Sequence, residues 1–334
     1  MKAVIVGYGL SGKTFHLPLL RAAGIDVRQV AVSRPRDPDP TTNVSFVDFA
    51  AACADQSVDI VVITSPNVLH CDHALAAIDA GKHVVIEKPM ATTARDAARI
   101  VRAAEMSNRL VTVFHNRRWD GDYLTVKRLL ENGRVGAWQI FQSHWGMNKP
   151  IPQTRWKDNQ DSGGGLLLDF MPHLVDQAIS LFGLPDVARL ERATQRAGGL
   201  GPDFLEISLA YGSRRAFLTT DCFTMGPTPR FRLAGTEGEY RSSGTDSQEA
   251  DLRAGISPNE LAYGHDKTPR QSDFYDLTGD AKQIDLEIGD YVQFYRGFLD
   301  AAAGKRLAPV ALDEAEQVVG IVDALMCNGR WERR

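Results

Sequence analysis

The first residues in the chain that could do chemistry are the glycines of the segment "GYGLSGKT". Gly7, Gly9 and Gly12 form G-x-G-x-x-G, the turn that binds the pyrophosphate of a dinucleotide. The same stretch, which ends in Lys13 and Thr14, also matches G-x-x-x-x-G-K-[ST], the P-loop that binds a nucleoside triphosphate with magnesium. The first pattern predicts hydride transfer with NAD(P), and the second predicts phosphoryl transfer.

The segments around these glycines favour the dinucleotide pattern. An apolar run, "KAVIV", precedes them and a helical pattern, "TFHLPLLRAAG", follows them, as the strand, turn and helix of dinucleotide binding require. A P-loop also needs an acidic residue at the end of a later strand to hold magnesium. The later strands end in "TSP" and "EKP", and neither fits this requirement.

The end of the second predicted strand bears on which dinucleotide is bound. An NAD enzyme usually places Asp or Glu there to accept from the ribose hydroxyls, whereas "VAVSRPRDP" has Ser33 and Arg34. A guanidinium pairs with a 2′-phosphate through charge-assisted hydrogen bonds. The sequence therefore predicts NADP as the preferred cofactor, with NAD possible. The alternative is that Arg34 and Arg36 are only solvated loop charges.

Polar residues collect where the strands of this first series end. Ligands of an open α/β sheet lie outside the carboxyl ends of its strands. The predicted cofactor contacts are Gly7, Gly9, Leu10, Ser11, Gly12, Lys13, Ser33, Arg34, Thr64, Pro66, Asn67, His70, Glu87 and Lys88. Asn67 could instead cap a helix, His70 could be an ordinary partly buried histidine, and Lys13 could face only solvent.

Two short segments carry groups suited to proton transfer. "IEKPM" places Lys88 after a buried strand and before a proline, where its ammonium could bind a substrate hydroxyl and where desolvation lowers a lysine pKa. "GGGLLLDFMPHLVDQ" places Asp169 and His173 four residues apart, on one face of a continuous helix. Pro172 either kinks this helix or marks its first turn. The alternative for Asp169 and His173 is a satisfied surface pair without a catalytic role.

The hydrophobic patterns that must position these residues change near residues 116 to 120. Before this point, short apolar runs alternate with helical patterns, which predicts an α/β domain with a doubly wound parallel sheet of the Rossmann type. After it come a long helical pattern over 165 to 183, alternating segments typical of antiparallel strands, and a last helix ending at Asn328 and Gly329. We predict a Rossmann domain over residues 1–118 and an α+β domain with a largely antiparallel open sheet over residues 119–334. Residues 241 to 290 are predicted to be loops with short strands.

Composition excludes several classes of partner. The 334 residues are 43% hydrophobic and 24% charged, with a net charge of −4, which predicts a globular protein that binds neither nucleic acid nor a membrane surface. The four cysteines lack metal-like spacing, so we expect reduced thiols and no metal site. The N-terminus has no hydrophobic segment long enough for a signal peptide or a membrane span, which predicts a cytoplasmic location.

Taken together, these segments resemble the glucose-fructose oxidoreductase, inositol dehydrogenase and rhizopine-catabolism family (Gfo/Idh/MocA). The likeness covers nearly the whole chain, and "EKP" with a later D-x-x-x-H is specific to the family in combination. "KTFH" and "HNRRWD" look most like the NADP-dependent scyllo-inositol dehydrogenases. One segment, "HWGMNKPIP", departs from that subgroup by lacking its arginines, and this leaves the substrate open.

The resemblance implies a role for each matching residue. Lys88 would hold the reacting hydroxyl, His173 would be the general acid/base, and Asp169 would be the acidic residue beside them. The implied substrate contacts are His115, Asn116, Arg117, Trp119, Arg155, Asp169 and His173. The family's second domain also implies a homo-oligomer, a dimer or tetramer, that assembles through the C-terminal sheet.

These observations predict an NADP-preferring oxidoreductase that transfers hydride between nicotinamide and a secondary alcohol or ketone of an inositol-like cyclic polyol or a sugar. One alternative is a cofactor-binding sensor of the same fold without catalysis, which need not retain Lys88, Asp169 and His173 together. Another is a reductase of a non-sugar substrate, whose pocket would have fewer polar groups than "HNRRW" and "RWKDN" offer.

Overall fold

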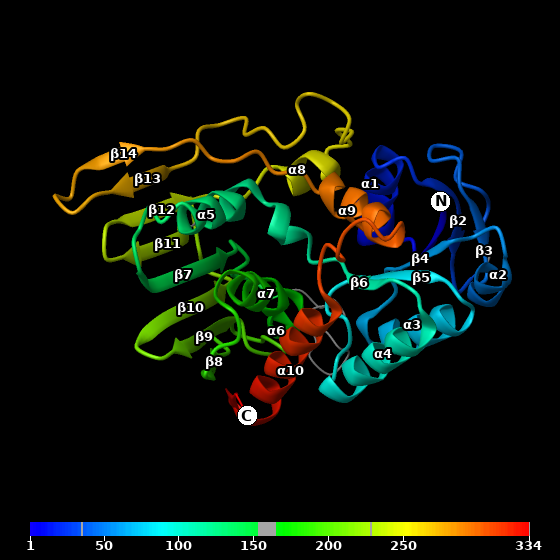
Figure 1. Ribbon diagram of the computed structural model, residues 1–334, viewed down its shortest axis with the longest axis horizontal. Coiled ribbons are helices and arrows are strands. Elements are labelled where there is room, and N and C mark those ends of the chain that lie inside the picture. The colour runs from blue at the N-terminus through cyan, green and yellow to red at the C-terminus, as the bar shows by residue number, and fades with distance from the viewer. Residues whose placement is uncertain (35, 153–164, 228, 334) are drawn as a thin grey trace. The chain divides into compact units, whose positions relative to one another are not determined.

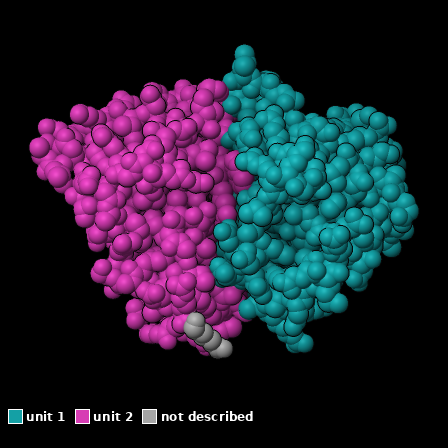
Figure 2. Space-filling model, viewed as in Figure 1, with its two compact units in different colours: residues 1–116, 248–263, 290–319 teal, residues 117–247, 264–289, 320–334 magenta. Residues whose placement is uncertain are grey.

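The computed structural model describes residues 1–34, 36–152, 165–227 and 229–333, which divide into two units. Unit 1 consists of Met1–Asn116, Gln248–Tyr263 and Asp290–Val319, and unit 2 of Arg117–Ser247, Gly264–Gly289 and Gly320–Arg334. Figure 2 colours unit 1 teal and unit 2 magenta. The chain first passes from unit 1 to unit 2 after Asn116, and the domain division at residue 118 stays a prediction. The chain returns to unit 1 twice.

Unit 1 is built on a six-stranded parallel sheet of Rossmann type, as predicted. Its strand order is β3-β2-β1-β4-β5-β6. The strands are β1 (Lys2–Val6), β2 (Asp26–Ala31), β3 (Ser45–Val47), β4 (Ile60–Ile63), β5 (His83–Ile86) and β6 (Val111–Val113). The order reverses between β1 and β4, and ligands of such sheets bind at this reversal, outside the carboxyl ends of the strands.

Helices cover both faces of this sheet, which explains the uninterrupted apolar runs of its strands. All four residues of β4 are fully buried. In Figure 1, α1 (Leu17–Ala22) and α9 (Val292–Ala302) lie on one face, and α3 (His70–Asp79) and α4 (Ala94–Ser107) lie on the other. The short helix α2 (Phe49–Ala54) follows β3.

Unit 2 contains a nine-stranded sheet with the order β14-β13-β12-β11-β7-β10-β9-β8-β15. The strands are β7 (Trp138–Gly146), β8 (Val187–Ala193), β9 (Phe204–Tyr211), β10 (Arg214–Asp221), β11 (Pro229–Gly235), β12 (Glu239–Ser243), β13 (Ser272–Tyr275), β14 (Ala281–Gln283) and β15 (Arg330–Glu332). All recorded pairs are antiparallel except that of β7 with β10. The sheet is therefore largely antiparallel, as predicted.

One face of this second sheet is covered by helices. On β9, Leu205, Ile207 and Leu209 are buried and alternate with more exposed residues, as a strand with one covered face requires. The helices α5 (Gly121–Glu131) and α7 (Met171–Phe182) pack against β11 and β10 of this sheet (Figure 1). α7 carries His173, so the sheet positions one of the predicted catalytic residues.

The predicted helix over residues 165 to 183 is two helices. α6 (Leu166–Asp169) ends before Phe170, and α7 begins at Met171. Pro172 lies in the first turn of α7, where its missing N–H costs no hydrogen bond. Pro172 was expected either to kink a helix or to mark its first turn, and the structure shows that it marks the first turn. Asp169 and His173 lie on different helices and not on one continuous face.

Two other elements differ from a simple interpretation of the sequence. The helix after the glycines opens with a π-helical turn, η1 (Ser11–His16). Residues 241 to 290 contain the short helix α8 (Gln248–Arg253) besides strands and loops. Six residues are too few for a clear helical period, so α8 left no pattern to recognise. The last helix, α10 (Leu312–Asn328), ends as predicted, with Gly329 at a φ of 65°.

Within the described residues, no group of three or more His, Cys, Asp or Glu side chains is arranged to hold a metal ion. The same residues include no helix with the length and apolar character that crossing a membrane requires. Cys53, Cys71 and Cys222 are buried free thiols, and Cys327 is an exposed one.

Candidate active site

The three glycines of the first turn serve two different purposes. A Cβ on Gly7 would lie 2.7 Å from O of Thr64, and a Cβ on Gly12 would lie 2.3 Å from O of Gly7. These two glycines are therefore required by the close approach of the backbone. A Cβ on Gly9 would meet no atom within 4 Å, so nothing in the protein itself excludes a side chain there. A bound pyrophosphate that approaches the backbone does exclude one, and the turn fits a dinucleotide.

Lys13 is paired within the protein. Its Nζ donates to Oδ2 of Asp39 at 3.0 Å, and the Tyr8 hydroxyl donates to the same oxygen at 2.9 Å. The Tyr8 hydroxyl also lies 2.7 Å from Oγ1 of Thr42. These contacts join the glycine turn to the loop that follows β2. Lys13 remains 49% exposed, so its ammonium is also open to solvent.

The loop after β2 presents Ser33 and Arg34, which are both exposed. Asp39 is the acidic residue of this loop that contacts the glycine turn, and its oxygens accept from Lys13, Tyr8 and Thr41. Its carboxylate is thus occupied by the protein's own donors. The arrangement is compatible with the predicted contact between Arg34 and a 2′-phosphate, which stays a prediction.

Thr64, directly after the neighbouring strand β4, is hydrogen-bonded to the glycine turn. Its Oγ1 lies 3.0 Å from the carbonyl oxygens of Val6 and of Gly7, and it donates to them. The end of β4 is thereby fastened to the end of β1 at the point where the strand order reverses. The predicted contact of Thr64 with the cofactor stays a prediction.

Glu87, directly after β5, accepts hydrogen bonds with both carboxylate oxygens. Oε1 accepts from Oγ of Ser11 and lies 3.0 Å from Nε2 of His16, and Oε2 accepts from the backbone N–H of the next residue at 2.9 Å. Burial raises the pKa of Glu87, but the hydrogen bonds and charges around it, foremost those of His16, outweigh burial and lower the pKa to about 2. The carboxylate is ionised at neutral pH. It ties the glycine turn to the backbone of Lys88.

His70, at the start of α3, is fully buried and uses both ring nitrogens. Nδ1 lies 2.8 Å from O of Pro89, and Nε2 lies 2.9 Å from O of Ser65. Burial lowers the pKa of His70, so the neutral imidazole is favoured. His70 joins the segment after β4 to the segment after β5. Its predicted cofactor contact, like those of Pro66 and Asn67, stays a prediction.

The second group of predicted residues lies in unit 2. Asp169 is the last residue of α6, and its N–H donates to O of Gly165 at 3.0 Å. His173 is buried in the first turn of α7. Lys88 belongs to unit 1, so the structure assigns the proposed catalytic residues to different units. Arg155, a predicted substrate contact, lies outside the described residues.

The segment after β6 carries the remaining predicted substrate contacts. His115 and Asn116 are buried residues of unit 1. Arg117 and Trp119 belong to unit 2, in the short helix η3 (Asn116–Trp119). The guanidinium carbon of Arg117 lies 4.5 Å from the ring centroid of Trp145, a residue of β7 that we did not select from the sequence.

A buried arginine connects this aromatic residue to α7. The guanidinium carbon of Arg230 lies 4.8 Å from the ring centroid of Trp145. Arg230 also donates to Oγ of Ser143 at 2.7 Å and to Oε1 of Gln177 at 3.1 Å. Gln177 lies one turn beyond His173 on α7, and its Nε2 donates to O of Arg117 at 2.8 Å. Arg230 is therefore a structural support for the segment that presents His173.

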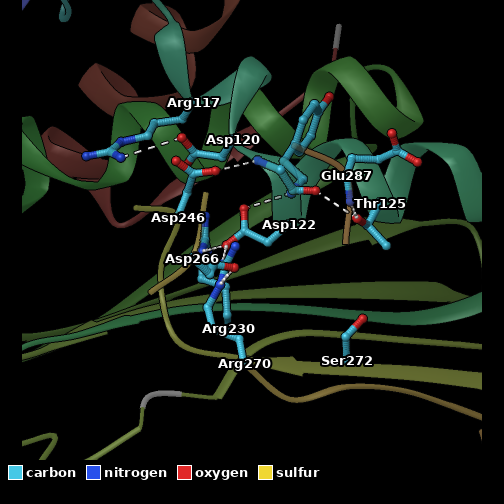
Figure 3. Close-up of polar contacts among 12 residues, drawn as sticks. Arg117, Asp120, Asp122, Thr125, Arg230, Asp246, Asp266, Arg270, Ser272 and Glu287 are labelled. Atoms are coloured by element: carbon cyan, nitrogen blue, oxygen red, sulfur yellow. Dashed lines mark hydrogen bonds and ion pairs between the residues drawn. The ribbon is translucent and has the colours of Figure 1, made fainter. Parts of the chain in front are cut away.

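Asp122 balances the charge of Arg230 at the start of α5 (Figure 3). Its Oδ2 lies 3.4 Å from Nε of Arg230 and 3.6 Å from Nη1 of Arg270. Asp246 accepts from the N–H of Gly121 at 2.7 Å, which satisfies one of the free donors at the helix N-terminus. These contacts anchor α5 and β11 to each other in the interior of unit 2.

Comparison with known families identifies both parts of the chain. Residues 1–115 match the Gfo/Idh/MocA model "Oxidoreductase family, NAD-binding Rossmann fold", and residues 127–328 match the model of its C-terminal alpha/beta domain. The chain belongs to the Gfo/Idh/MocA oxidoreductase family. The resemblance inferred from "EKP" and the later D-x-x-x-H is thereby confirmed, and with it the assignment as an oxidoreductase with an NAD(P)-binding Rossmann domain.

Individual relatives of this family member are similar over their full length. The scyllo-inositol 2-dehydrogenase (NADP(+)) IolW of Bacillus subtilis (strain 168) is 32% identical, over 100% of this chain and 95% of the relative. The uncharacterized oxidoreductase YdgJ of Escherichia coli (strain K12) is 34% identical, over 96% of this chain and 93% of the relative. The solved structure of the oxidoreductase yvaA from Bacillus subtilis superposes with a TM-score of 0.93 at 30% identity, over 100% of this chain and 98% of that one.

Several residues around the site of this family member were not selected from the sequence. His16 lies in an apolar helical segment, and Tyr295 is 279 positions away from it. Trp145 and Arg230 lie on strands whose side-chain alternation alone gave no chemical signal. Their importance comes from contacts between segments far apart in the chain, which a single sequence does not reveal.

Proposed function

We propose that this oxidoreductase prefers NADP and interconverts a secondary alcohol and a ketone of an inositol-like cyclic polyol or a sugar. The substrate class is supported by the full-length similarity to IolW, whose name specifies scyllo-inositol and NADP(+). Met147 and Asn148 stand where the resemblance to the scyllo-inositol dehydrogenases leads us to expect arginines, and this is the reason to include sugars beside inositols.

The observation that supports the cofactor preference is that the Asp39 carboxylate already accepts hydrogen bonds from other residues of the protein. In an NAD enzyme a free carboxylate near the end of β2 accepts from the ribose hydroxyls. Asp39 is engaged by Lys13, Tyr8 and Thr41, while the Arg34 guanidinium is exposed on the same loop. A guanidinium in this position pairs with a 2′-phosphate.

The chain's own residues hold the substrate and move its proton. Bound NADP(H) supplies or accepts the hydride at its nicotinamide ring. The Lys88 ammonium donates a hydrogen bond to the reacting hydroxyl oxygen and stabilises the negative charge that develops there. His173 removes the hydroxyl proton during oxidation and returns it during reduction. Asp169 orients His173 or binds a neighbouring hydroxyl.

The substrate is tested with a panel of inositols and aldoses, each assayed with NADP and with NAD. We expect the largest kcat/KM for a cyclic polyol or sugar with NADP. Equal or better turnover with NAD contradicts the role of Arg34. Absence of turnover with every polyol and sugar, together with turnover of a non-sugar carbonyl compound and NADPH, contradicts the substrate class.

We also propose a homo-oligomer, a dimer or tetramer, that assembles through the nine-stranded sheet. The support is the face of the sheet opposite α5 and α7, where half-buried apolar residues such as Phe204 and Phe217 stand beside charged ones. Sedimentation equilibrium measures the assembly directly. A monomer at micromolar concentration contradicts this proposal and leaves the proposed reaction unaffected.

A further inference from the structure

A chain of hydrogen bonds runs through the interior of unit 1 from α9 to the glycine turn. It starts at Tyr295 on α9, whose hydroxyl is bonded to Nδ1 of His16, and it continues from Nε2 of His16 to Oε1 of Glu87 at 3.0 Å. Tyr295 and His16 are both 0% exposed. Residues from three separate segments of unit 1 therefore form one hydrogen-bonded series, whose members Tyr295 and His16 are fully buried.

Aromatic rings enclose this chain. The centroid of the Phe114 ring lies 4.4 Å from that of His16, and the same ring stacks on Tyr295 at 5.8 Å. Phe294 packs edge-on against Phe114 at 4.9 Å. Polar groups in such surroundings must be hydrogen-bonded, and apolar side chains of similar volume often give equal or better stability. The stability of the fold alone therefore does not account for the hydrogen-bonded series of Tyr295, His16 and Glu87.

The two ends of this hydrogen-bonded series, Glu87 and Tyr295, have a defined protonation state. The Glu87 carboxylate is ionised and can only accept, so Nε2 of His16 carries the proton that it donates. Burial raises the pKa of Tyr295 well above its ordinary value, so the phenol keeps its proton. The Tyr295 hydroxyl and Nδ1 of His16 share the other hydrogen bond. Each member is fixed in one orientation by the next.

Glu87, at the end of this hydrogen-bonded series, contacts two segments of unit 1 that carry predicted site residues. The oxygen of Glu87 that accepts from His16 also accepts from Oγ of Ser11, in the glycine turn. The other oxygen accepts from the backbone N–H of Lys88 at 2.9 Å. A rotation of the Glu87 carboxylate would disturb both contacts at once.

We propose that Tyr295 and His16 are positioning residues, which fix the Glu87 carboxylate and thereby hold Ser11 for the cofactor and Lys88 for the substrate. The inference rests on the proposed catalytic role of Lys88. Tyr295 and His16 are fully buried, so they act through Glu87 and not by touching substrate. Their loss is expected to lower kcat and weaken cofactor binding while KM for the alcohol changes little.

The test uses four variants of the full chain. Tyr295→Phe removes one hydroxyl and keeps the ring, His16→Leu removes the donor to Glu87, and His16→Gln restores an N–H donor of similar reach. Tyr263→Phe is the matched control, because Tyr263 is a buried tyrosine of unit 1 whose hydroxyl donates to Gln248 at 3.0 Å. The Kd for NADPH is measured by titration, kcat and KM with the best polyol of the panel, and Tm by calorimetry.

We expect Tyr295→Phe and His16→Leu to lower kcat about tenfold and to raise the Kd for NADPH about threefold, as expected when one buried hydrogen bond is lost. His16→Gln should recover most of both losses. Tyr263→Phe should lower Tm by a similar amount while kcat and the Kd for NADPH stay unchanged. The inference is overturned if Tyr295→Phe matches Tyr263→Phe in both kcat and the Kd for NADPH.

Replacement of Lys88 separates this inference from the proposed function. If Lys88→Met abolishes turnover while Tyr295→Phe and His16→Leu behave like the control, only the positioning chain is refuted. If Lys88→Met turns over normally, the proposed mechanism fails. In that case, if Tyr295→Phe also leaves the Kd for NADPH unchanged, the proposal that Tyr295 positions Ser11 for the cofactor is overturned as well.

Discussion

Nζ of Lys13 donates a hydrogen bond of 3.0 Å to Oδ2 of Asp39, which joins the glycine turn to the loop after β2. Hydrogen bonds from Thr41, Lys13 and Tyr8 hold the pKa of Asp39 far below its ordinary value. The carboxylate therefore stays ionised and acts as a fixed acceptor for the protein's own groups. The loop that it holds also carries Arg34, so under the proposed function cofactor affinity would depend on the same contact as loop structure.

Replacement of Arg34 with Ala is expected to weaken binding of NADP and not of NAD. A charge-assisted hydrogen bond to a phosphate contributes about 1.5–3 kcal/mol, which corresponds to a rise of about 10- to 100-fold in Kd. The Kd for NADPH and for NADH, measured by fluorescence titration, checks this. The contact with a 2′-phosphate is refuted if both values rise by the same factor.

Replacement of Asp39 with Asn is expected to weaken the binding of NADP and of NAD to a similar extent. The variant loses the charge that binds Lys13, and the loop is then held less firmly for either dinucleotide. We expect the Kd for NADPH and for NADH to rise by a similar factor, about three- to tenfold. A selective loss of NADH binding would show instead that Asp39 contacts the ribose hydroxyls.

Replacement of Lys88 with Met is expected to lower kcat on the order of a hundredfold or more, because the alkoxide that forms during oxidation loses its hydrogen-bond donor. The backbone N–H of residue 88 still donates to Glu87 in this variant, so the segment keeps its anchor. The Kd for NADPH should therefore stay nearly unchanged. Turnover close to that of the unaltered protein contradicts the proposed mechanism.

The stability of the protein is expected to depend on Glu87 in acid. Its pKa is lowered from 4.5 to about 2 in the folded state, so its contribution is complete above pH 4.5 and is lost as the pH falls toward 2. The shift corresponds to about 3 kcal/mol of the free energy of unfolding. Urea unfolding of Glu87→Gln and the unaltered protein at several pH values measures this. The difference between the two free energies of unfolding should shrink as the pH falls from 5 to 3. A difference that stays constant over this range contradicts the predicted contribution of Glu87.

Local sequence patterns were enough to predict the parts of the fold that depend on local physics. The parallel strands have apolar runs because both faces are buried, and β4 is completely buried in the structure. The end of α10 was predicted from Asn328 and Gly329, and Gly329 does adopt a positive φ. Lys88 was selected because a polar residue after a buried strand is placed at the ligand edge of such a sheet.

The remaining features depend on contacts between distant segments. Tyr295 reaches His16 because α9 returns to unit 1 after the chain has built most of unit 2. The break at Phe170 separates two helices whose apolar pattern is continuous, so periodicity alone could not locate it. No sequence pattern singled out Asp39, and only the fold shows that it accepts from the glycine turn.

Replacement of Arg230 with Ala is expected to destabilise the protein strongly. Arg230 is fully buried and contacts Asp122, Ser143 and Gln177, which lie on α5, β7 and α7. Removing one partner of a buried ion pair costs about 3–5 kcal/mol, and here it leaves Asp122 with a weaker balance of charge. We expect a lower urea midpoint and, because Gln177 lies one turn from His173 on α7, a fall in kcat of any folded fraction.

Arg232 provides the matched control on the same strand. It pairs with Glu239 at 2.7 Å but is 35% exposed, and exposed ion pairs contribute about 0–1 kcal/mol. Arg232→Ala should therefore leave the urea midpoint and kcat nearly unchanged. A third variant, Arg230→Met, fills most of the volume but removes one of the two arginines that pair with Asp122, so we expect it to be nearly as unstable as Arg230→Ala. If Arg230→Met is instead as stable as the unaltered protein, Arg230 contributes by filling space and not by balancing the buried charge of Asp122.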